Sequence, residues 1–472
     1  MLNPSYKNKF VNYSPTKRFL TILEPAPAWT AILGFVFCTF LLIMAGAGSI
    51  LNLFFPAGAL IVGVFLYFRA PILYLGFTWW ICFLSPLVRR LADYRSSFTE
   101  PSPILLAPFL VVLVTLVTLY KNLPKAHRIG ALPYILCLAS IFFGICLGFV
   151  QTSPISVGIN ALKWLSPVLL SFHLFVNWRE YPNYRQNIRR VFLWGVLVMG
   201  VYGIFQYLTA PEWDRFWHIN SGMRSIGIPE PLGIRVWSTM NSPGPFAFFM
   251  MAGLLTLIDR TGALSIFASV FGYLSFLLTL LRTAWLGWFG AIVILFSSLK
   301  AKHQMRLILI FAVLAMSLVP LIAMDSFSES ITSRLDTFSN IENDGSGQAR
   351  LGVYSRFLSN PSIALIGTGM GNYEVTSELE IGDSGLIGIF LSFGWFGGSV
   401  YLSGMLKLIF ELWSFSGRSP DRFINIANAI AMSSLFILPL AYSNLDVHGI
   451  CLWGFLGIGL AGKKYYQSQR AI

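Results

Sequence analysis

Long apolar segments follow one another along almost the whole of this chain, and they restrict its fold more than any other feature. A helix needs about 20 apolar residues to cross the hydrocarbon of a bilayer. Fourteen segments of suitable length lie near residues 29–48, 50–68, 71–88, 103–120, 129–150, 155–177, 191–208, 242–258, 262–281, 283–299, 307–324, 385–407, 424–441 and 447–462. We therefore expect an all-α polytopic membrane protein, a bundle of about 12–14 transmembrane helices.

The overall composition agrees with this fold class and argues against two kinds of function. Charged residues make up 11% of the chain, whereas a soluble protein has about a quarter. The net charge of +13 could suggest nucleic-acid binding, but the Lys and Arg of cytoplasmic loops in membrane proteins account for it. All five cysteines fall inside apolar segments, without the spacing of metal ligands. We expect no nucleic-acid partner, no metal and no cofactor.

One extended polar segment, Asp325–Asp383, interrupts the apolar pattern. Irregular charged backbone is not stable in hydrocarbon, so we expect this segment to be a large extracytoplasmic loop. Within it, Gln348–Asn360 has a helical pattern that ends before Pro361. The predicted organisation is transmembrane helices over 1–324 with a polar outer segment at 209–241, then the partly helical loop 325–383, then C-terminal transmembrane helices over 384–472.

The distribution of cations predicts the orientation of the bundle. With both termini in the cytoplasm, cytoplasmic segments hold 22 of the 33 Lys and Arg residues, as the positive-inside rule requires. Of the 11 on the outer side, ten are Arg and one is Lys163. Solubility does not require Arg rather than Lys, whereas bidentate binding of phosphate or carboxylate does. The outer arginines are predicted either to bind an anionic substrate or to pair with acidic residues on the same side.

Arg282 is the most informative single residue in the sequence. It lies between two apolar segments, in a hairpin too short to leave the membrane. A cation that lies within the membrane needs an anionic partner, which is either a substrate or an acidic residue of the same chain. His448, in the short connection Tyr442–His448 on the same predicted side, is either a base or a structural histidine.

Two glycine patterns and one aromatic segment have more than one interpretation. Gly144 and Gly148 have the spacing of a close-packing face between transmembrane helices. The run Gly367–Gly371 lacks the strand and helix of a dinucleotide site, so we expect a turn whose backbone approaches a ligand or a neighbouring segment. The tryptophans of the outer segment Thr209–Asn241 suit either sugar faces or the membrane interface.

The order of several motifs resembles that of a known family. In chain order they are Arg235-Val-Trp-Ser-Thr-Met-Asn241-Ser-Pro-Gly-Pro, Arg282-Thr-Ala-Trp-Leu-Gly, Gln348-Ala-Arg350, Gly367-Thr-Gly369-Met-Gly371 and Asp383-Ser384. Over roughly residues 230–410, this order is similar to that of the bacterial O-antigen polymerase and ligase family of polytopic membrane glycosyltransferases.

The resemblance implies an enzyme that takes a glycan from undecaprenyl pyrophosphate outside the bacterial inner membrane. Polymerases transfer the glycan to another lipid-linked repeat unit, whereas ligases transfer it to a lipid A core. Ligases of this family carry a His-Asn pair where this chain has Asp383-Ser384, which favours a polymerase of O-antigen or exopolysaccharide. The implied partners are the lipid-linked donor and acceptor, the bilayer and a chain-length regulator protein.

The implied chemistry gives expected roles to single residues. Arg282 would neutralise the negative charge that grows on the leaving pyrophosphate, without a metal. The acceptor hydroxyl needs a base within hydrogen-bond reach, for which Asp383 is the first candidate, before Glu380, His448 and His218. Further substrate contacts are expected from Arg224, Arg235, Asn241, Arg350 and Arg356.

Two other classes of function stay open at this point. A transporter of lipid-linked oligosaccharides should carry internal repeats and polar sites at the middle of the membrane, and the sequence shows neither. A non-catalytic scaffold of a polysaccharide assembly complex would not need Arg282.

Overall fold

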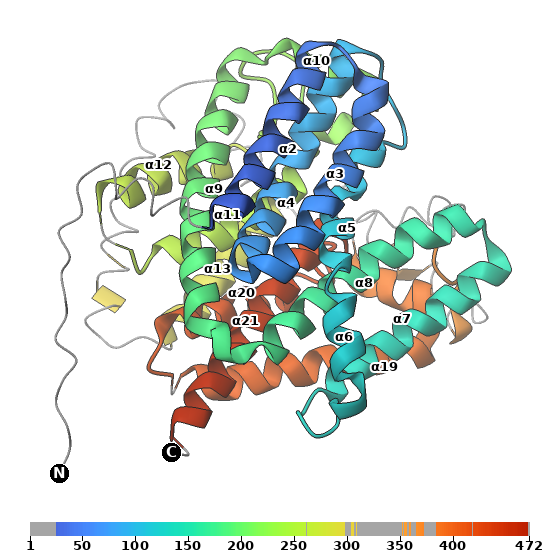
Figure 1. Ribbon diagram of the computed structural model, residues 1–472, viewed down its shortest axis with the longest axis vertical. Helices are drawn as coiled ribbons and strands as arrows, with labels where there is room; N and C mark the ends of the chain where they lie inside the picture. The colour runs from blue at the N-terminus through green and yellow to red at the C-terminus, as the bar shows by residue number, and fades with distance from the viewer. Residues whose placement is uncertain are drawn as a thin grey trace.

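The computed structural model describes residues 25–260, 262–297, 304–305, 308, 352, 354–355, 358–359, 365–371, 384–417 and 419–470, and of Arg224 only the backbone. The regular secondary structure of these residues is helical, without a β-strand. Eight of their helical segments are long and apolar enough to cross a membrane. The chain is therefore an all-α multi-pass membrane protein, as its apolar pattern predicts (Figure 1).

The helices of the N-terminal half coincide with the first seven predicted spans. They are α2 (Ala26–Met44), α3 (Gly48–Arg69), α4 (Pro71–Arg95), α5 (Ala107–Leu113) and α6 (Leu116–Asn122) flanked by the 3-10 turns η1 (Pro103–Leu106) and η2 (Leu123–Lys125), α7 (Leu132–Gln151), α8 (Pro154–Val176), the 3-10 turn η3 (Trp178–Glu180) and α9 (Tyr181–Thr209). The fourth predicted span, 103–120, is thus broken into short pieces rather than forming one helix.

The helices that follow are α10 (Glu212–Ser221), the 3-10 turn η4 (Arg224–Ile226), α11 (Pro243–Leu257), α12 (Ala263–Leu277), α13 (Arg282–Ser297), α19 (Gly385–Ser416), α20 (Arg422–Phe436) and α21 (Asp446–Arg470). Of these, α10 and η4 lie in the predicted outer segment 209–241, and the others match the remaining predicted spans within the described ranges. The span predicted at 307–324 lies almost wholly outside the described residues, and so do most of the predicted loop 325–383 and of its helix Gln348–Asn360. These expectations stay predictions.

Helix α9 defines the two sides of the bundle. Its last residue, Thr209, leads into α10, and its first residue, Tyr181, contacts the ring of Tyr465 near the end of α21, with 5.8 Å between ring centroids. Figure 1 shows α10 at the top of the bundle and the C-terminus at the bottom. We refer below to the α10 side and to the opposite side.

Helix α4 extends beyond its predicted end at residue 88 because its charged residues have partners. Arg89 forms an ion pair with Asp93 at 3.2 Å, one turn further along the helix. Arg90 pairs with Asp214 of α10, and both side chains are fully buried. A paired charge does not have to stay in water, so the helix continues to Arg95 on the α10 side.

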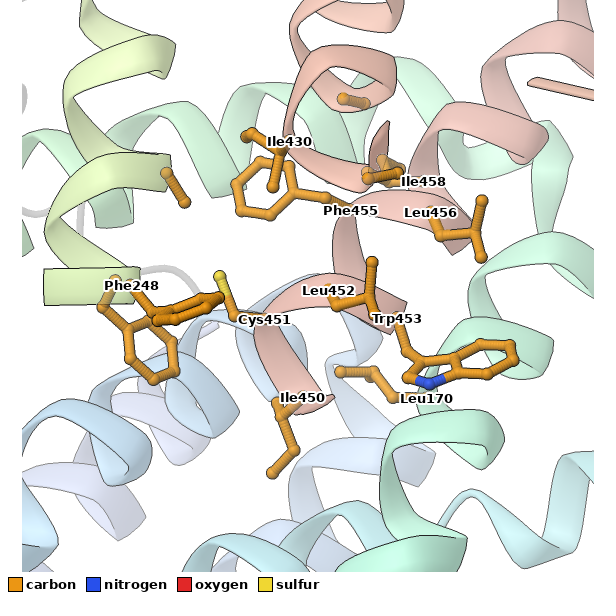
Figure 2. Packing of buried hydrophobic residues seen from close by; sticks show 14 of the residues in the cluster. Leu170, Phe248, Ile430, Ile450, Cys451, Leu452, Trp453, Phe455, Leu456 and Ile458 are labelled. Atoms are coloured by element: carbon orange, nitrogen blue, oxygen red, sulfur yellow. The ribbon is translucent and has the colours of Figure 1, made fainter. Parts of the chain in front are cut away.

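The centre of the bundle is α21, which is buried on all sides. Every residue from Gly449 to Ala461 is buried, and a helix with apolar residues all round belongs in a core. Figure 2 shows Cys451, Leu452, Trp453 and Phe455 pointing from α21 in different directions into neighbouring helices. Helices α8, α19 and α20 all pack against it.

Glycine at position 457 allows α8 to approach α21 closely. A Cβ atom at Gly457 would lie 2.6 Å from the Cα atom of Ser171, a backbone atom that has little room to move. We expect Gly457→Val to destabilise the protein by about 1–3 kcal/mol through overpacking. Gly34→Val is the matched control, since nothing lies within 4 Å of a Cβ at that position. Thermal denaturation in detergent should show a lower midpoint for Gly457→Val alone, and equal midpoints would contradict the packing.

The outer surface of the first two helices is apolar. Phe37 and Phe40 of α2 and Leu53 of α3 are exposed, and side chains of this kind are stable against hydrocarbon rather than water. This surface agrees with a lipid bilayer as the environment of the protein.

Candidate functional site

A cavity of about 810 Å³ lies among segments that meet on the α10 side. Its walls come from the second half of α4, the η1–α5 segment, α8, the start of α11 and the start of α21. Most of the wall is apolar. The polar groups that line it are Ser85, Glu100, Ser102, Ser156, Lys163, Asn241, Ser242, Asp446 and His448. A volume of this size suits an organic ligand rather than a few waters.

A second cavity, of about 350 Å³, shares part of its wall with the first. Lys163 of α8 and Asp446 and His448 of α21 line both cavities. The other walls of the smaller cavity come from the turn Thr368–Gly371, the first part of α19, further residues of α8, and Tyr442 and Leu445 before α21. The three shared side chains therefore stand where two ligands could meet.

Lys163 and Asp446 form the charged centre of this region. The Nζ atom of Lys163 lies 3.5 Å from Oδ2 of Asp446, and the two side chains are 29% and 35% exposed. Asp446 begins α21 with a φ of 62°, and its Oδ1 atom accepts a hydrogen bond of 2.6 Å from the backbone N–H of Val447. That conformation is strained for a residue other than glycine, and it turns the carboxylate toward Lys163.

His448 of α21 lies against the start of α11. Its ring meets the ring of Phe248 edge to face, with 4.9 Å between centroids. A Cβ atom at Gly244 would lie 3.5 Å from its Nε2 atom, an ordinary van der Waals distance, so the start of α11 lies directly beside the imidazole. Asn241 lies just before Pro243, which begins α11. The Oδ1 atom of Asn241 has no hydrogen-bond partner among the residues described.

The turn Gly367–Gly371 approaches neighbouring backbone, as expected. Its three glycines all have positive φ, with values of 87°, 70° and 91°, which only glycine adopts easily. The N–H of Thr368 donates to the carbonyl of Leu391 at 2.7 Å, next to a non-helical residue in α19, Gly394. The turn thus fits into a kink of α19 and forms a wall of the smaller cavity.

The Gly144 and Gly148 pair of α7 forms the close-packing face that its spacing predicts. A Cβ atom at Gly144 would lie 2.6 Å from the ring of Phe393 in α19. At Gly148 it would lie 2.5 Å from the carbonyl oxygen of Met370. The N–H of Met370 donates to the carbonyl of Gly144 at 3.0 Å. The two glycines therefore fix the turn against α7.

The structure brings together only some of the residues expected to bind substrate. Asn241 and His448 share the larger cavity. Arg235 instead donates to three backbone carbonyls, those of Ser225, Thr279 and Leu280. Arg282 is the first residue of α13 and is not among the residues that line the two cavities. The roles predicted for both arginines stay predictions.

Of the remaining expected site residues, only His218 has a described side chain. Arg350, Arg356, Glu380 and Asp383 lie outside the described residues, as does the side chain of Arg224. His218, a weaker candidate base, is buried in α10 with its ring 5.7 Å from that of Trp237. Burial lowers the pKa of His218 below its usual value. It lines neither cavity.

The tryptophans of segment 209–241 correct an expectation. Trp217 and Trp237 are 1% and 0% exposed, with their ring centroids 5.8 Å apart. Together with Ala210, Ile226 and Ile234 they form a small apolar core beneath α10. Because their rings are covered, these two can neither stack on a sugar nor lie at a membrane interface. The residue types alone did not reveal that these two tryptophans are buried.

A buried polar network attaches segment 209–241 to the transmembrane helices. Asp214 accepts hydrogen bonds from Arg90, from Nε2 of Gln206 at 2.7 Å and from the hydroxyl of Tyr202 at 3.0 Å. Oε1 of Gln206 accepts from the backbone N–H of Ser238 at 2.8 Å. Arg90 also donates to the carbonyl of Ser238. The network thus positions the chain that leads to Asn241 and the larger cavity.

Sequence reasoning missed Lys163, Asp446 and Glu100 as residues of the cavity wall. A signal for Asp446 was present, because it precedes His448 by two residues in the short connection between two apolar segments. Glu100 offered no such signal. Its carboxylate also pairs with Arg89 at 2.9 Å.

Comparison with known proteins does not identify the function of this site. No protein-family model matches the chain, and no curated protein matches it. Its function is therefore inferred from its own residues.

Proposed function

We propose that this chain is a membrane glycosyltransferase that polymerises undecaprenyl-pyrophosphate-linked oligosaccharide repeat units into O-antigen or exopolysaccharide. The observation that carries the proposal is the pair of adjoining cavities with Lys163, Asp446 and His448 between them. A polymerase must hold two lipid-linked glycans at once, a donor and an acceptor. Two cavities that share a charged wall suit this requirement.

The apolar part of the larger cavity suits the polyprenyl part of the donor. Leu105, Leu106 and Phe109 line it from η1 and α5, and Ile155 and Ile159 line it from α8. Apolar walls with a few convergent polar groups are typical of sites for amphipathic ligands. In this arrangement the isoprenoid lies along the apolar wall, and the pyrophosphate lies at Lys163.

The reaction displaces a lipid pyrophosphate from the anomeric carbon of the donor. A hydroxyl oxygen of the acceptor glycan forms the new bond to that carbon, and the bond from the carbon to the phosphate oxygen breaks with its electron pair on the oxygen. The Lys163 ammonium stabilises the negative charge that develops there. Stabilisation of this charge is also the role proposed for Arg282, the first choice from the sequence.

The proton of the acceptor hydroxyl must pass to a base within hydrogen-bond reach. Among the described residues, the His448 imidazole lines both cavities and is the candidate for this role. Asp383, the first candidate from the sequence, precedes Ser384 at the start of α19. Asp446 holds Lys163 in place through its ion pair.

The proposed location is the bacterial inner membrane, with the α10 side facing outward and both termini in the cytoplasm. Cysteine scanning tests this orientation. In a variant without the five native cysteines, cysteine replacing the exposed Asn220 of α10 should react with an impermeant maleimide in cells with a permeabilised outer membrane. Cysteine replacing the exposed Ser414 of α19 should not react. The reverse pattern would place the cavities on the cytoplasmic side and contradict the proposal.

Deletion of the gene distinguishes the proposed function from its alternatives. Loss of a polymerase should leave surface polysaccharide of single repeat units on a gel. Loss of a ligase should remove polysaccharide from lipid A while lipid-linked polymer accumulates. Loss of a transporter should leave single lipid-linked repeat units in the cytoplasmic leaflet. A chain-length regulator is a further proposed partner, which would change the length of the polymer but not its presence.

A further inference from the structure

The side of the bundle opposite α10 carries a cluster of arginines around one carboxylate. Oδ1 of Asp259 lies 2.6 Å from Nη1 of Arg422, and its Oδ2 lies 3.6 Å from Nη2 of Arg189. Nη1 of Arg260 donates to the backbone carbonyl of Arg189 at 2.8 Å. Arg190 follows on α9 and is exposed. The cluster therefore joins the start of α9, the α11–α12 connection and the start of α20.

Arg189 and Arg422 pair with Asp259, and the neighbouring carboxylate of Asp421 is paired with Arg185. Among the described residues, Arg190 and Arg260 add two positive charges beside these pairs. Burial, together with the charges of Arg189 and Arg190, lowers the pKa of Arg260. Like charges held this closely are stabilised by an anion. In the described part of the chain, Arg190 forms no ion pair that would supply one.

An apolar stripe begins one turn along α9 from the cluster. Trp194, Val198 and Val201 follow Arg190 at helical spacing and are 49%, 39% and 44% exposed, so they share one face of the helix. From Arg190 to Val201 the helix rises about 16 Å, roughly one leaflet of a hydrocarbon core about 30 Å thick. Helix α12 packs beside α9 and adds the exposed Ile266 and Phe267.

We propose that Arg190 and Arg260, beside the ion pairs of Asp259, bind the phosphate of an anionic phospholipid, whose acyl chains lie along the stripe on α9 and α12. A free phosphate would use the arginines alone. The continuation of the site into an exposed apolar face of one leaflet's depth assigns a lipid. Clusters of arginine next to transmembrane helices bind anionic head groups in this way. The site lies on the other side of the bundle from the two cavities and does not depend on the enzymatic activity.

Lipid binding to the purified protein tests this proposal. Native mass spectrometry of the detergent-solubilised protein is carried out with phosphatidylglycerol, with phosphatidylcholine and with inorganic phosphate. Wild type should retain one phosphatidylglycerol more tightly than phosphatidylcholine of the same chain length. The double variant Arg190→Gln/Arg260→Gln, which keeps both ion pairs of Asp259, should bind phosphatidylglycerol roughly 25-fold more weakly.

The control is Arg128→Gln, which removes an exposed arginine from the connection before α7 and should leave the affinity unchanged. Equal binding of the two lipids, equal loss in Arg128→Gln, or full affinity in the double variant would each overturn the proposal. Competition by inorganic phosphate alone, without any preference for lipid, would overturn the assignment of a lipid. If the double variant does not fold, Arg190→Gln alone should still lose affinity about fivefold, and unchanged affinity would again overturn it.

Discussion

Replacing Asp214 by alanine is expected to destabilise the protein by about 3–5 kcal/mol, the usual result of breaking a buried ion pair by removing one partner. Asp214 and Arg90 are both 0% exposed. Without the carboxylate, the guanidinium of Arg90 stays buried with the carbonyl of Ser238 as its acceptor on that segment. Gln206 and Tyr202 each lose an acceptor as well. Equilibrium unfolding in mixed detergent micelles measures the change.

Two further variants separate the ion pair from other effects. Glu212→Ala removes an exposed carboxylate from the same helix and should change stability little. The double variant Arg90→Met/Asp214→Leu should regain part of the stability lost in Asp214→Ala, because it removes the unpaired buried charge but leaves Gln206 and Tyr202 without their acceptor. If Asp214→Ala unfolds like Glu212→Ala, the network does not hold segment 209–241 in place.

Replacing Lys163 by methionine is expected to lower the rate of glycan polymerisation by about 10- to 100-fold. Methionine keeps the length of the side chain and removes the ammonium group. A charge-assisted hydrogen bond contributes about 1.5–3 kcal/mol, which is about one to two decades in rate if the bond forms mainly in the transition state. The rate is measured with purified protein and a lipid-linked repeat unit.

The matched control for Lys163 is Lys125→Met. Lys125 is exposed in η2 and lines neither cavity, so its replacement should leave the rate unchanged. Thermal denaturation of both variants shows whether a lower rate results from loss of folded protein. A wild-type rate in folded Lys163→Met would remove Lys163 from the proposed mechanism.

The positions of the helices were largely predictable from the sequence, because hydrocarbon requires about 20 apolar residues in each crossing. The ends of the helices were less predictable. Helix α4 continues to Arg95 because Arg90 finds Asp214 far along the chain. The span predicted at 103–120 breaks near Thr115, whose hydroxyl bonds the carbonyl of Val112 at 2.7 Å. Neither proline nor glycine lies between α5 and α6, so no helix-breaking residue indicates this break in advance.

The candidate site was predictable only in part, because it depends on which helices are neighbours. Asn241 and His448 were expected to be functional, whereas Lys163 was given no role and was noted only as the one lysine among the outer cations. The sequence could not place Lys163 beside Asp446, since this contact requires α8 to pack against α21. Arg235 shows a second limit of predicting a site from sequence. Its residue type suits a phosphate, but its guanidinium lies on the carbonyls that end α12, and no sequence pattern distinguishes these two uses.

The central claim is that this protein elongates lipid-linked glycans at the two adjoining cavities, and one measurement tests it most directly. Purified wild-type protein is supplied with undecaprenyl-pyrophosphate-linked repeat units alone, without nucleotide sugar or lipid A core, and the products are separated on a gel. Our account predicts a ladder of longer glycans, which is lost in His448→Ala and strongly reduced in Lys163→Met but kept in Lys125→Met. Repeat units that stay at their original length with folded wild-type protein would contradict the account.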